Sequence, residues 1–421
     1  MKATFTPEST PSAGFPKRKV AFFESLLTGQ LQKIKTGCLI MRHAGTEQRF
    51  GSVLNHTPIG FEVTNPAFFR KACLGGSLGV ADSFTAGDWH TSDLVGFFRL
   101  FLQNLDVMDN MEGGWAALLN KFARWGYLLG QKNTVKGSRR NIALHYDLGN
   151  DFYKLMLDPT MTYSCGIFAT EETTLEEASL AKYDRIIEQL NIKEGQTVLE
   201  IGCGWGGFAK RLLDTTGAIW TGTTISKEQH AYARKVIDQS GNADRANLLM
   251  DDYRTLSGSY DRIVSIEMIE AVGHEYLPTY FSKISDLLHP DGAALVQAIT
   301  MPDHRYDQYL KEVDYIRTRV FPGSCVPSIS AMTSAVAKKS DLRPTGIHDI
   351  GYHYARTLRE WRLRFVENEE EIKSLGYDDA FRRAWIYYLC YCEAGFEEGY
   401  TGDIHLLLTK PGCKVGKGFP Q

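Results

Sequence analysis

The 421-residue sequence lacks any apolar run long enough to cross a membrane. A transmembrane helix needs roughly 20 consecutive apolar residues, and no segment approaches that length. The N-terminus is polar and has no apolar core of the kind found in signal peptides. These absences predict a cytoplasmic protein that reaches any membrane only from outside the bilayer.

Paired cysteines and excess charge are also missing. The 8 cysteines are scattered and form no C-x-x-C pair, which argues against a disulfide framework. No group of histidine, cysteine and acidic residues has metal-ligand spacing, so we expect no metal. The formal net charge is only −3, which creates no overall attraction to nucleic acid. We therefore expect no nucleic-acid partner.

The residue pattern divides the chain into four parts. We predict a flexible tail at 1–18, a smaller mixed α+β domain at 19–125, a basic linker at 126–140 and a catalytic domain at 141–421. In the smaller domain we expect strands at 37–42, 48–53 and 61–66, with helices at 23–34, 93–108 and 115–129. The linker carries Lys132, Lys136, Arg139 and Arg140.

Along the catalytic domain, segments with a strand pattern alternate with segments that have a helical pattern. Short apolar runs predict strands, and segments with apolar residues at helical spacing predict helices. The strands are expected at 196–202, 218–226, 246–252, 260–268 and 293–300, and the helices at 173–192, 206–217, 226–241 and 276–292, the last closing at a Pro-Asp-Gly turn. Repeated β-α-β units with apolar strands predict an α/β fold with a doubly wound, mostly parallel, Rossmann-like sheet.

A glycine-rich loop follows the first of these strands. The sequence VLEIGCGWGG (198–207) joins a buried strand to a helix, and its glycines allow a tight turn close to a ligand. Such a loop alone is a weak signal. Here, however, Glu200 lies on the strand itself, the next strand ends in TGTTIS without an acid, and Asp252 follows the third strand. This arrangement resembles motif I of the class I methyltransferases.

Seven further segments carry a more specific resemblance. They are HYDLGNDFYKLMLDPTMTYSCGIF, LEIGCGWGG, TTISKEQ, MIEAVGHEYLPTYF, VFPGSCVPS, HYARTLREW and CEAGFEEG, in this order between about 137 and 410. Together they resemble the cyclopropane-fatty-acyl-phospholipid synthases and mycolic acid cyclopropane synthases. The segment GGSLGVADSFTAGDWHTSDL resembles the additional N-terminal domain of the full-length bacterial members.

The resemblance implies a reaction and its participants. The methyl group of S-adenosylmethionine would be transferred to the double bond of an unsaturated phospholipid acyl chain. The resulting carbocation would lose a proton to bound bicarbonate and close a cyclopropane ring. The enzyme would work transiently at the inner face of the membrane, and the full-length family members imply a homodimer. Residues implied to bind S-adenosylmethionine are Tyr163, Ser164, Glu200, Gly202, Cys203, Gly204, Gly206, Thr224, Ser226, Gln229, Asp252 and Tyr253.

The same resemblance implies a site for bicarbonate. It assigns Cys165, Glu270, Ile299 and Tyr354 to this anion, with Cys165 as a lining residue and not a nucleophile. At the fifth position, where the family has histidine, this chain has Gln297. An amide still offers an N–H donor but cannot become cationic. We therefore expect an anion site with a weaker electrostatic grip.

Other functions remain open at the level of the sequence. The same carbocation could end as a methylene or methyl branch instead of a ring. The chain could also be a small-molecule amine N-methyltransferase, because some of these enzymes share this fold and several of these motifs. A lipid-binding protein with an inactive site is the non-enzyme alternative. The N-terminal domain and the basic linker favour a lipid substrate, and the intact Gly202, Glu270 and Tyr354 favour an active enzyme.

Overall fold

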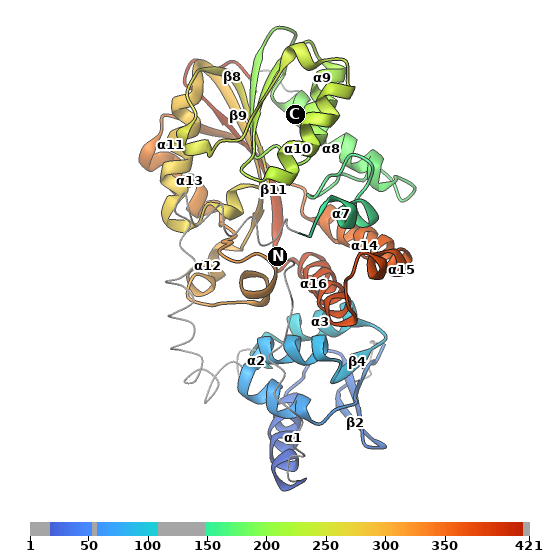
Figure 1. The fold of residues 1–421 in the computed structure, drawn as a ribbon. Helices are drawn as coiled ribbons and strands as arrows, with labels where there is room; N and C mark the ends of the chain where they lie inside the picture. The colour runs from blue at the N-terminus through green and yellow to red at the C-terminus, as the bar shows by residue number, and fades with distance from the viewer. Residues whose placement is uncertain (1–16, 53–56, 108–147, 416–421) are drawn as a thin grey trace.

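The computed structural model describes residues 17–52, 57–107 and 148–415, and it contains two sheets (Figure 1). The smaller sheet is built from the N-terminal residues of the described chain, and the larger one from the catalytic part. Two predicted features, the helix at 115–129 and the basic residues Lys132 to Arg140, lie outside the described residues. The division of the chain into the four predicted ranges stays a prediction.

The described residues of the N-terminal part form a four-stranded sheet with three helices. The strand order is β2-β1-β3-β4, with β1 antiparallel to β2 and parallel to β3. The elements are α1 (Lys17–Leu31), β1 (Cys38–His43), β2 (Thr46–Gly51), β3 (Ile59–Val63), α2 (Ala67–Ala86), β4 (Trp89–Thr91) and α3 (Leu94–Leu102). Because α1 begins at Lys17, the last two residues of the predicted tail belong to a helix.

The catalytic part contains a seven-stranded sheet in the order β10-β11-β9-β8-β5-β6-β7. Neighbouring strands from β9 to β7 are parallel, while β11 is antiparallel to both β9 and β10. The strands are β5 (Thr197–Ile201), β6 (Ile219–Thr223), β7 (Ala246–Leu249), β8 (Tyr260–Ile266), β9 (Leu288–Thr300), β10 (Arg343–Asp349) and β11 (Gly402–Thr409). The predicted α/β fold with a mostly parallel sheet is confirmed.

Helices cover both faces of this sheet (Figure 1). One hydrophobic cluster packs α11 (Leu277–Leu287) and α13 (Ile329–Lys339) on one face. Another packs α8 (Leu175–Gln189), α9 (Gly207–Thr215) and α10 (Lys227–Gln239) on the other face. Buried strands between two helical layers explain why their sequences are nearly continuous apolar runs.

The predicted helix at 276–292 is too long. The helix α11 ends at Leu287, and the turn residues through Gly292 form the irregular start of β9. Proline has no amide N–H and biases the preceding residue toward extended backbone, so Pro290 favours this early change from helix to strand. The prediction placed the Pro-Asp-Gly turn at the end of the helix, but it lies inside the strand β9.

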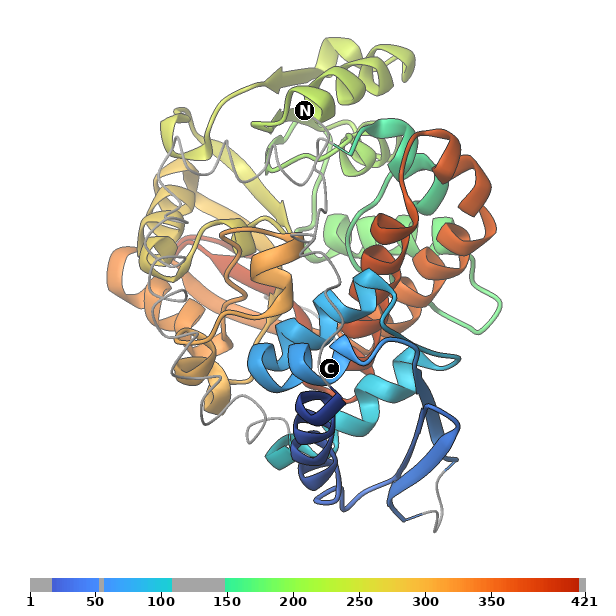
Figure 2. The same cartoon turned by 60° about the horizontal axis from the view of Figure 1, so that its bottom comes forward.

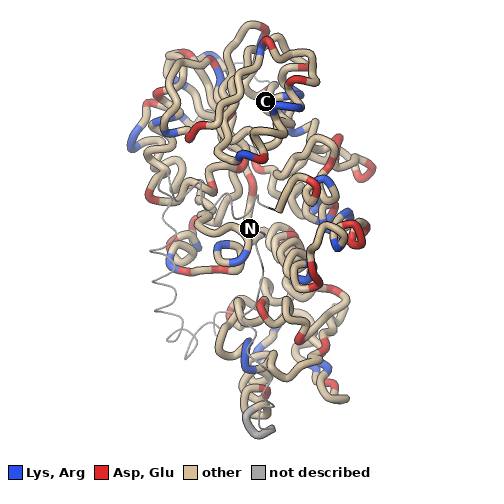
Figure 3. Tube along the Cα trace, viewed as in Figure 1, with Lys and Arg blue, Asp and Glu red and all other residues tan. Residues whose placement is uncertain are grey.

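Further helices surround the catalytic sheet. They are α7 (Asn150–Met156), α12 (Asp303–Tyr309), α14 (Tyr352–Glu367), α15 (Glu369–Ser374) and α16 (Asp379–Glu397). Short 3-10 helices lie at Ala243–Arg245, Tyr253–Thr255, Ile269–Ala271 and His274–Tyr276, and a π-helical turn at Ile316–Val320. Among the described residues, none of the helices is both long and apolar enough to cross a bilayer. Acidic and basic residues are interspersed along the described chain (Figure 3).

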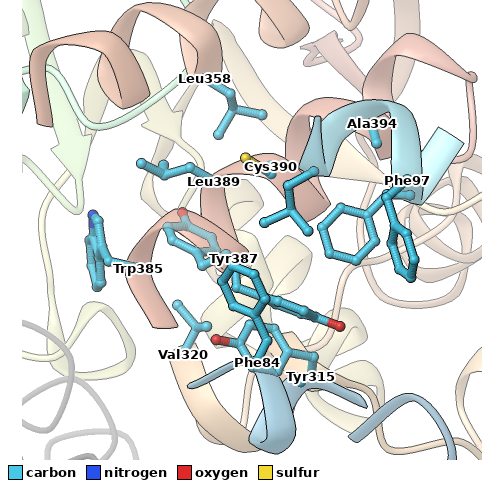
Figure 4. Close-up of a cluster of buried hydrophobic side chains, with 14 of the residues drawn as sticks. Phe84, Phe97, Tyr315, Val320, Leu358, Trp385, Tyr387, Leu389, Cys390 and Ala394 are labelled. Atoms are coloured by element: carbon cyan, nitrogen blue, oxygen red, sulfur yellow. The ribbon is translucent and has the colours of Figure 1, made fainter. Parts of the chain in front are cut away.

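The helix α16 joins the two parts of the molecule. It packs against both α2 and α3, which lie beside it in the two views (Figures 1 and 2). Aromatic rings fill this contact, including Phe84 against Tyr387 at a centroid distance of 5.5 Å and Phe98 against Tyr387 at 4.8 Å (Figure 4). Arg99 of α3 also pairs with Glu397 at 2.8 Å. The two parts therefore share one continuous core.

Replacing Phe84 with alanine tests this shared core. The ring is 8% exposed and packs on Trp89 as well as Tyr387. Removing such a ring costs about 3–5 kcal/mol, so Phe84→Ala should clearly lower the urea midpoint of unfolding. Phe22→Ala serves as the control because that ring is 63% exposed. Equal midpoints for Phe84→Ala and the wild type would show that the shared core contributes little to stability.

Candidate active site

A cavity of about 420 Å³ lies at the carboxyl ends of the parallel strands. Its walls include the loops that follow β5, β6, β7 and β8, and its far side is formed by residues of α2 and α3. The carboxyl edge of an open α/β sheet is where such folds bind ligands. One cavity therefore connects the glycine-rich loop with the N-terminal part of the molecule.

The glycine-rich loop leaves space for a ligand. Gly202 and Gly204 have φ angles of +83° and +52°, a backbone region that favours glycine. A Cβ on Gly202 would lie 2.8 Å from the side chain of Met268, whereas a Cβ on Gly204 would meet nothing within 4 Å. The open space beside Gly204 belongs to the cavity, as expected for the cofactor loop.

Polar side chains surround this end of the cavity. Glu200 accepts a hydrogen bond from Trp220 Nε1 at 2.9 Å, and burial raises the pKa of Glu200 to about 7. On the neighbouring loops, Thr224 donates to Gln229 at 2.9 Å. Asp252 is held by two hydrogen bonds from the guanidinium group of Arg254, of 2.8 and 2.6 Å. These acceptors and amides fit the polar groups of a nucleoside bearing an amino acid.

Most of the predicted site residues line this one cavity. They are Tyr163, Ser164, Glu200, Gly202, Cys203, Gly204, Thr224, Gln229, Asp252, Tyr253, Glu270, Ile299 and Tyr354. Two predicted cofactor residues, Gly206 and Ser226, do not line the cavity and cap helices instead. Gly206 caps the start of α9, where a Cβ would lie 3.2 Å from Ala233, and Ser226 caps α10 by accepting from the amide of Gln229.

Two further predicted residues also lie outside the lining. The side chain of Cys165 is fully buried and its thiol donates to backbone carbonyls. Burial raises the pKa of Cys165 well above its ordinary value, so this thiol is inert. The backbone N–H of Cys165, and not its thiol, donates to Glu267 in the site. Gln297 is likewise fully buried, beneath the cavity floor.

The centre of the site is the carboxylate of Glu267, which is not among the residues predicted from the sequence. Glu267 follows β8 and faces the cavity. Its Oε1 accepts a hydrogen bond from the backbone N–H of Cys165 at 2.8 Å and another from Gln297 Nε2 at 2.8 Å. Its Oε2 accepts from the hydroxyl of Tyr354 at 2.6 Å. Three of the five predicted anion contacts thus converge on one side chain of the protein.

Two more acidic side chains, Asp403 and Glu270, lie near Glu267. Gln297 Nε2 donates to Asp403 at 2.9 Å as well, so its amide bridges two carboxyl groups. Glu270 accepts from the backbone N–H of Ile299 at 2.7 Å, and its other oxygen has no partner. Burial, together with the charge of Glu267, raises the pKa of Glu270 to about 8. A fully buried cation, Lys182, donates to Ser164 at 2.6 Å nearby.

These contacts do not fit a bicarbonate ion in the implied position. An anion needs free donors, and the donors of Cys165, Gln297 and Tyr354 are already bonded to Glu267. The fourth, the N–H of Ile299, is bonded to Glu270. An added anion would also have to lie beside a buried carboxylate. Among the described residues there is also no group of three or more His, Cys, Asp or Glu side chains suited to a metal ion.

The sequence is similar to those of known proteins. The sequence model of the family described as mycolic acid cyclopropane synthetase matches residues 133–406. A tuberculostearic acid methyltransferase of Mycobacterium tuberculosis is 35% identical over 353 residues, covering 82% of each chain. The cyclopropane-fatty-acyl-phospholipid synthase of Escherichia coli is 33% identical, covering 85% of this chain and 89% of its own.

Solved structures show the same likeness. A cyclopropane synthase of Mycobacterium tuberculosis aligns with a TM-score of 0.61 and 32% identity, over 65% of this chain and 98% of its own. A mycolic acid cyclopropane synthase complexed with S-adenosylhomocysteine aligns with the same TM-score and 31% identity. With the glycine-rich loop and the cavity that it borders, these likenesses identify S-adenosylmethionine as the methyl donor. The chain belongs to the mycolic acid cyclopropane synthetase family of S-adenosylmethionine-dependent methyltransferases.

Proposed function

We propose that this enzyme methylates the double bond of an unsaturated phospholipid acyl chain and closes a cyclopropane ring. One observation carries the proposal. The glycine-rich cofactor loop lines one end of the cavity, and the cavity continues to the apolar helices α2 and α3 of the N-terminal part. A cofactor and an acyl chain can therefore meet in a single cavity.

The walls of this space suit an acyl chain. Val80 of α2 and Phe97, Phe98 and Phe101 of α3 line it on the N-terminal side. Tyr387 of α16, which packs against Phe98, lines the cavity beside them. Apolar and aromatic surfaces of this kind favour binding of a hydrocarbon by removing it from water.

The same walls suit a carbocation. S-adenosylmethionine supplies an electrophilic methyl group, and its addition to a double bond leaves a positive charge on the acyl chain. Water would trap this cation, so the site has to be dry. Aromatic faces stabilise cations, and the rings of Tyr354, Tyr388 and Phe396 line the cavity. Their role is to exclude water and to stabilise charge until a proton is lost.

The substrate implies an encounter with a membrane surface. We propose that the enzyme docks transiently on the inner face of the membrane, with its basic residues at 132–140 contacting anionic lipid. Exposed cations near such a surface contribute about 1 kcal/mol each. The bicarbonate ion implied by the resemblance has no part in this proposal, because its donors are already bonded to Glu267.

The direct test uses purified enzyme, methyl-labelled S-adenosylmethionine and vesicles of a monounsaturated phospholipid. We expect the label in the acyl chains of these vesicles, and none in matched vesicles of the saturated phospholipid. A set of small amines tests the N-methyltransferase alternative. Label in an amine but not in the unsaturated lipid would overturn the proposal. The likeness to coclaurine N-methyltransferase, at 20% identity, shows the fold alone.

A branched product is the second candidate. It is favoured by the 35% identity to a protein named as a tuberculostearic acid methyltransferase and not as a cyclopropane synthase. Proton NMR of the product lipid separates the two, because cyclopropyl protons resonate far upfield and methylene protons in the olefinic region. Upfield signals support the ring, and olefinic or new methyl signals support the branch.

A further inference from the structure

We infer that the carboxylate of Glu267 is the base of this enzyme. It removes the proton that, according to the family resemblance, a bound bicarbonate ion would remove. The inference rests on the proposed function, since it names the group that completes that reaction. The observations that carry it are the hydrogen bonds, the backbone and the charges around Glu267.

The hydrogen bonds place a carboxylate where an anion was expected. The backbone N–H of Cys165 and the amide of Gln297 each donate to Oε1 at 2.8 Å, and the hydroxyl of Tyr354 donates to Oε2 at 2.6 Å. Burial raises the pKa of Glu267, and the hydrogen bonds from Tyr354 and Cys165 oppose this rise by stabilising the ionised form. They also fix its position, which matters more for proton removal than basicity does.

The backbone at Glu267 is held in a costly conformation. Its φ angle is +47°, in the left-handed region that favours glycine. A non-glycine residue held in this way typically costs about 1–3 kcal/mol, and such residues cluster at functional sites. The conformation turns the chain at the end of β8 and directs the Glu267 side chain to the cavity. A glycine would relieve the strain but would bring no carboxylate.

The neighbouring acids leave the negative charge on Glu267. Burial and the charge of Glu267 raise the pKa of Asp403 well above its ordinary value, and the pKa of Glu270 rises to about 8 for the same two reasons. Glu270 is therefore mostly protonated near neutral pH. Glu270 receives a single hydrogen bond and Asp403 shares the amide of Gln297, whereas Glu267 receives three.

The proposed step is a single proton transfer. One C–H bond of the newly added methyl group breaks, and its proton moves to a carboxylate oxygen of Glu267. The electron pair of that bond forms the new carbon–carbon bond to the neighbouring cationic carbon and closes the ring. Glu267 becomes neutral, and it returns its proton to solvent when the product leaves. No external anion or oxidant is consumed.

Two substitutions of Glu267 test this assignment in buffers freed of carbon dioxide and in buffers with added bicarbonate. Glu267→Gln keeps the shape but cannot accept the proton, and we expect a loss of turnover on the order of a hundredfold or more. Glu267→Gly relieves the positive φ and frees all three donors. Its turnover should be low without bicarbonate and should rise at least tenfold when bicarbonate or formate is added.

The wild type should turn over equally with and without bicarbonate. Calorimetric binding of S-adenosylmethionine shows that each variant is folded, and Glu371→Gln on the exposed surface of α15 is the matched control. A wild type that needs bicarbonate, a Glu267→Gln variant within twofold of wild type, or a folded Glu267→Gly variant that no small anion rescues would overturn the inference. If the wild type itself fails to modify any phospholipid, the proposed function fails instead.

Discussion

Gly204→Asp should abolish binding of S-adenosylmethionine and leave the fold intact. Gly204 has a φ of +52°, a region that aspartate tolerates better than most residues, and a Cβ there meets nothing within 4 Å. The new side chain would therefore enter the cavity instead of clashing with the protein. It would occupy cofactor space and repel the carboxylate of the cofactor. Isothermal titration should show no binding heat.

Gly195→Asp is the matched control for this variant. Gly195 also has a positive φ, of +76°, and a Cβ there also meets nothing within 4 Å. It lies in the turn before β5 and does not line the cavity. It should therefore share the backbone cost and keep cofactor affinity. Wild-type affinity in Gly204→Asp would mean that the glycine-rich loop has been misassigned.

Gln297→Leu should lower turnover on the order of a hundredfold without changing cofactor affinity. Its amide bridges Glu267 and Asp403 with hydrogen bonds of 2.8 and 2.9 Å. Leucine has similar volume but no donor, so Glu267 would lose one of the groups that hold it in place. Removing one such donor from a catalytic centre typically costs about 10²–10³ in turnover. Steady-state kinetics with saturating cofactor measures this loss.

Gln189→Leu separates this effect from a general loss of stability. Gln189 is also buried, and its side chain is hydrogen-bonded to His405 at 2.9 Å, on the strand that pairs with Gln297. It does not line the cavity. Both variants should unfold at lower denaturant, since each leaves a buried polar group without its partner. Similar losses of turnover in the two variants would show that Gln297 acts only through stability.

Much of the fold could be predicted because its signals are local. The strands β5, β6, β7 and β8 are short apolar runs between helices, and the glycines after β5 mark the cofactor loop. The helix α2 was not predicted, since Gly75, Gly76 and Gly79 disfavour a helix and Gly76 kinks it. The end of α11 was misplaced because strand pairing, a long-range contact, decides where β9 begins.

The site could be predicted only in part for the same reason. The family resemblance assigned Glu270. Glu267 stands three residues earlier, in the segment SIEMIEAVG, and carried a signal of its own, because it is also an acid at the end of a buried strand. Asp403 carried none, because it lies 106 residues beyond Gln297 and reaches the site only through the pairing of β11 with β9. Lys182 appeared as an ordinary residue of an amphipathic helix.

The most direct test of the whole account is methylation with S-adenosylmethionine whose methyl group carries deuterium at all positions. A base beside the added methyl group removes a deuteron from it, so mass spectrometry and NMR should show a product lipid in which the new carbon has lost one deuteron and kept the others. This result is expected with unsaturated phospholipid and should not depend on bicarbonate. A new carbon that keeps its full set of deuterons would place the base elsewhere, and no transfer to the acyl chain would contradict the account entirely.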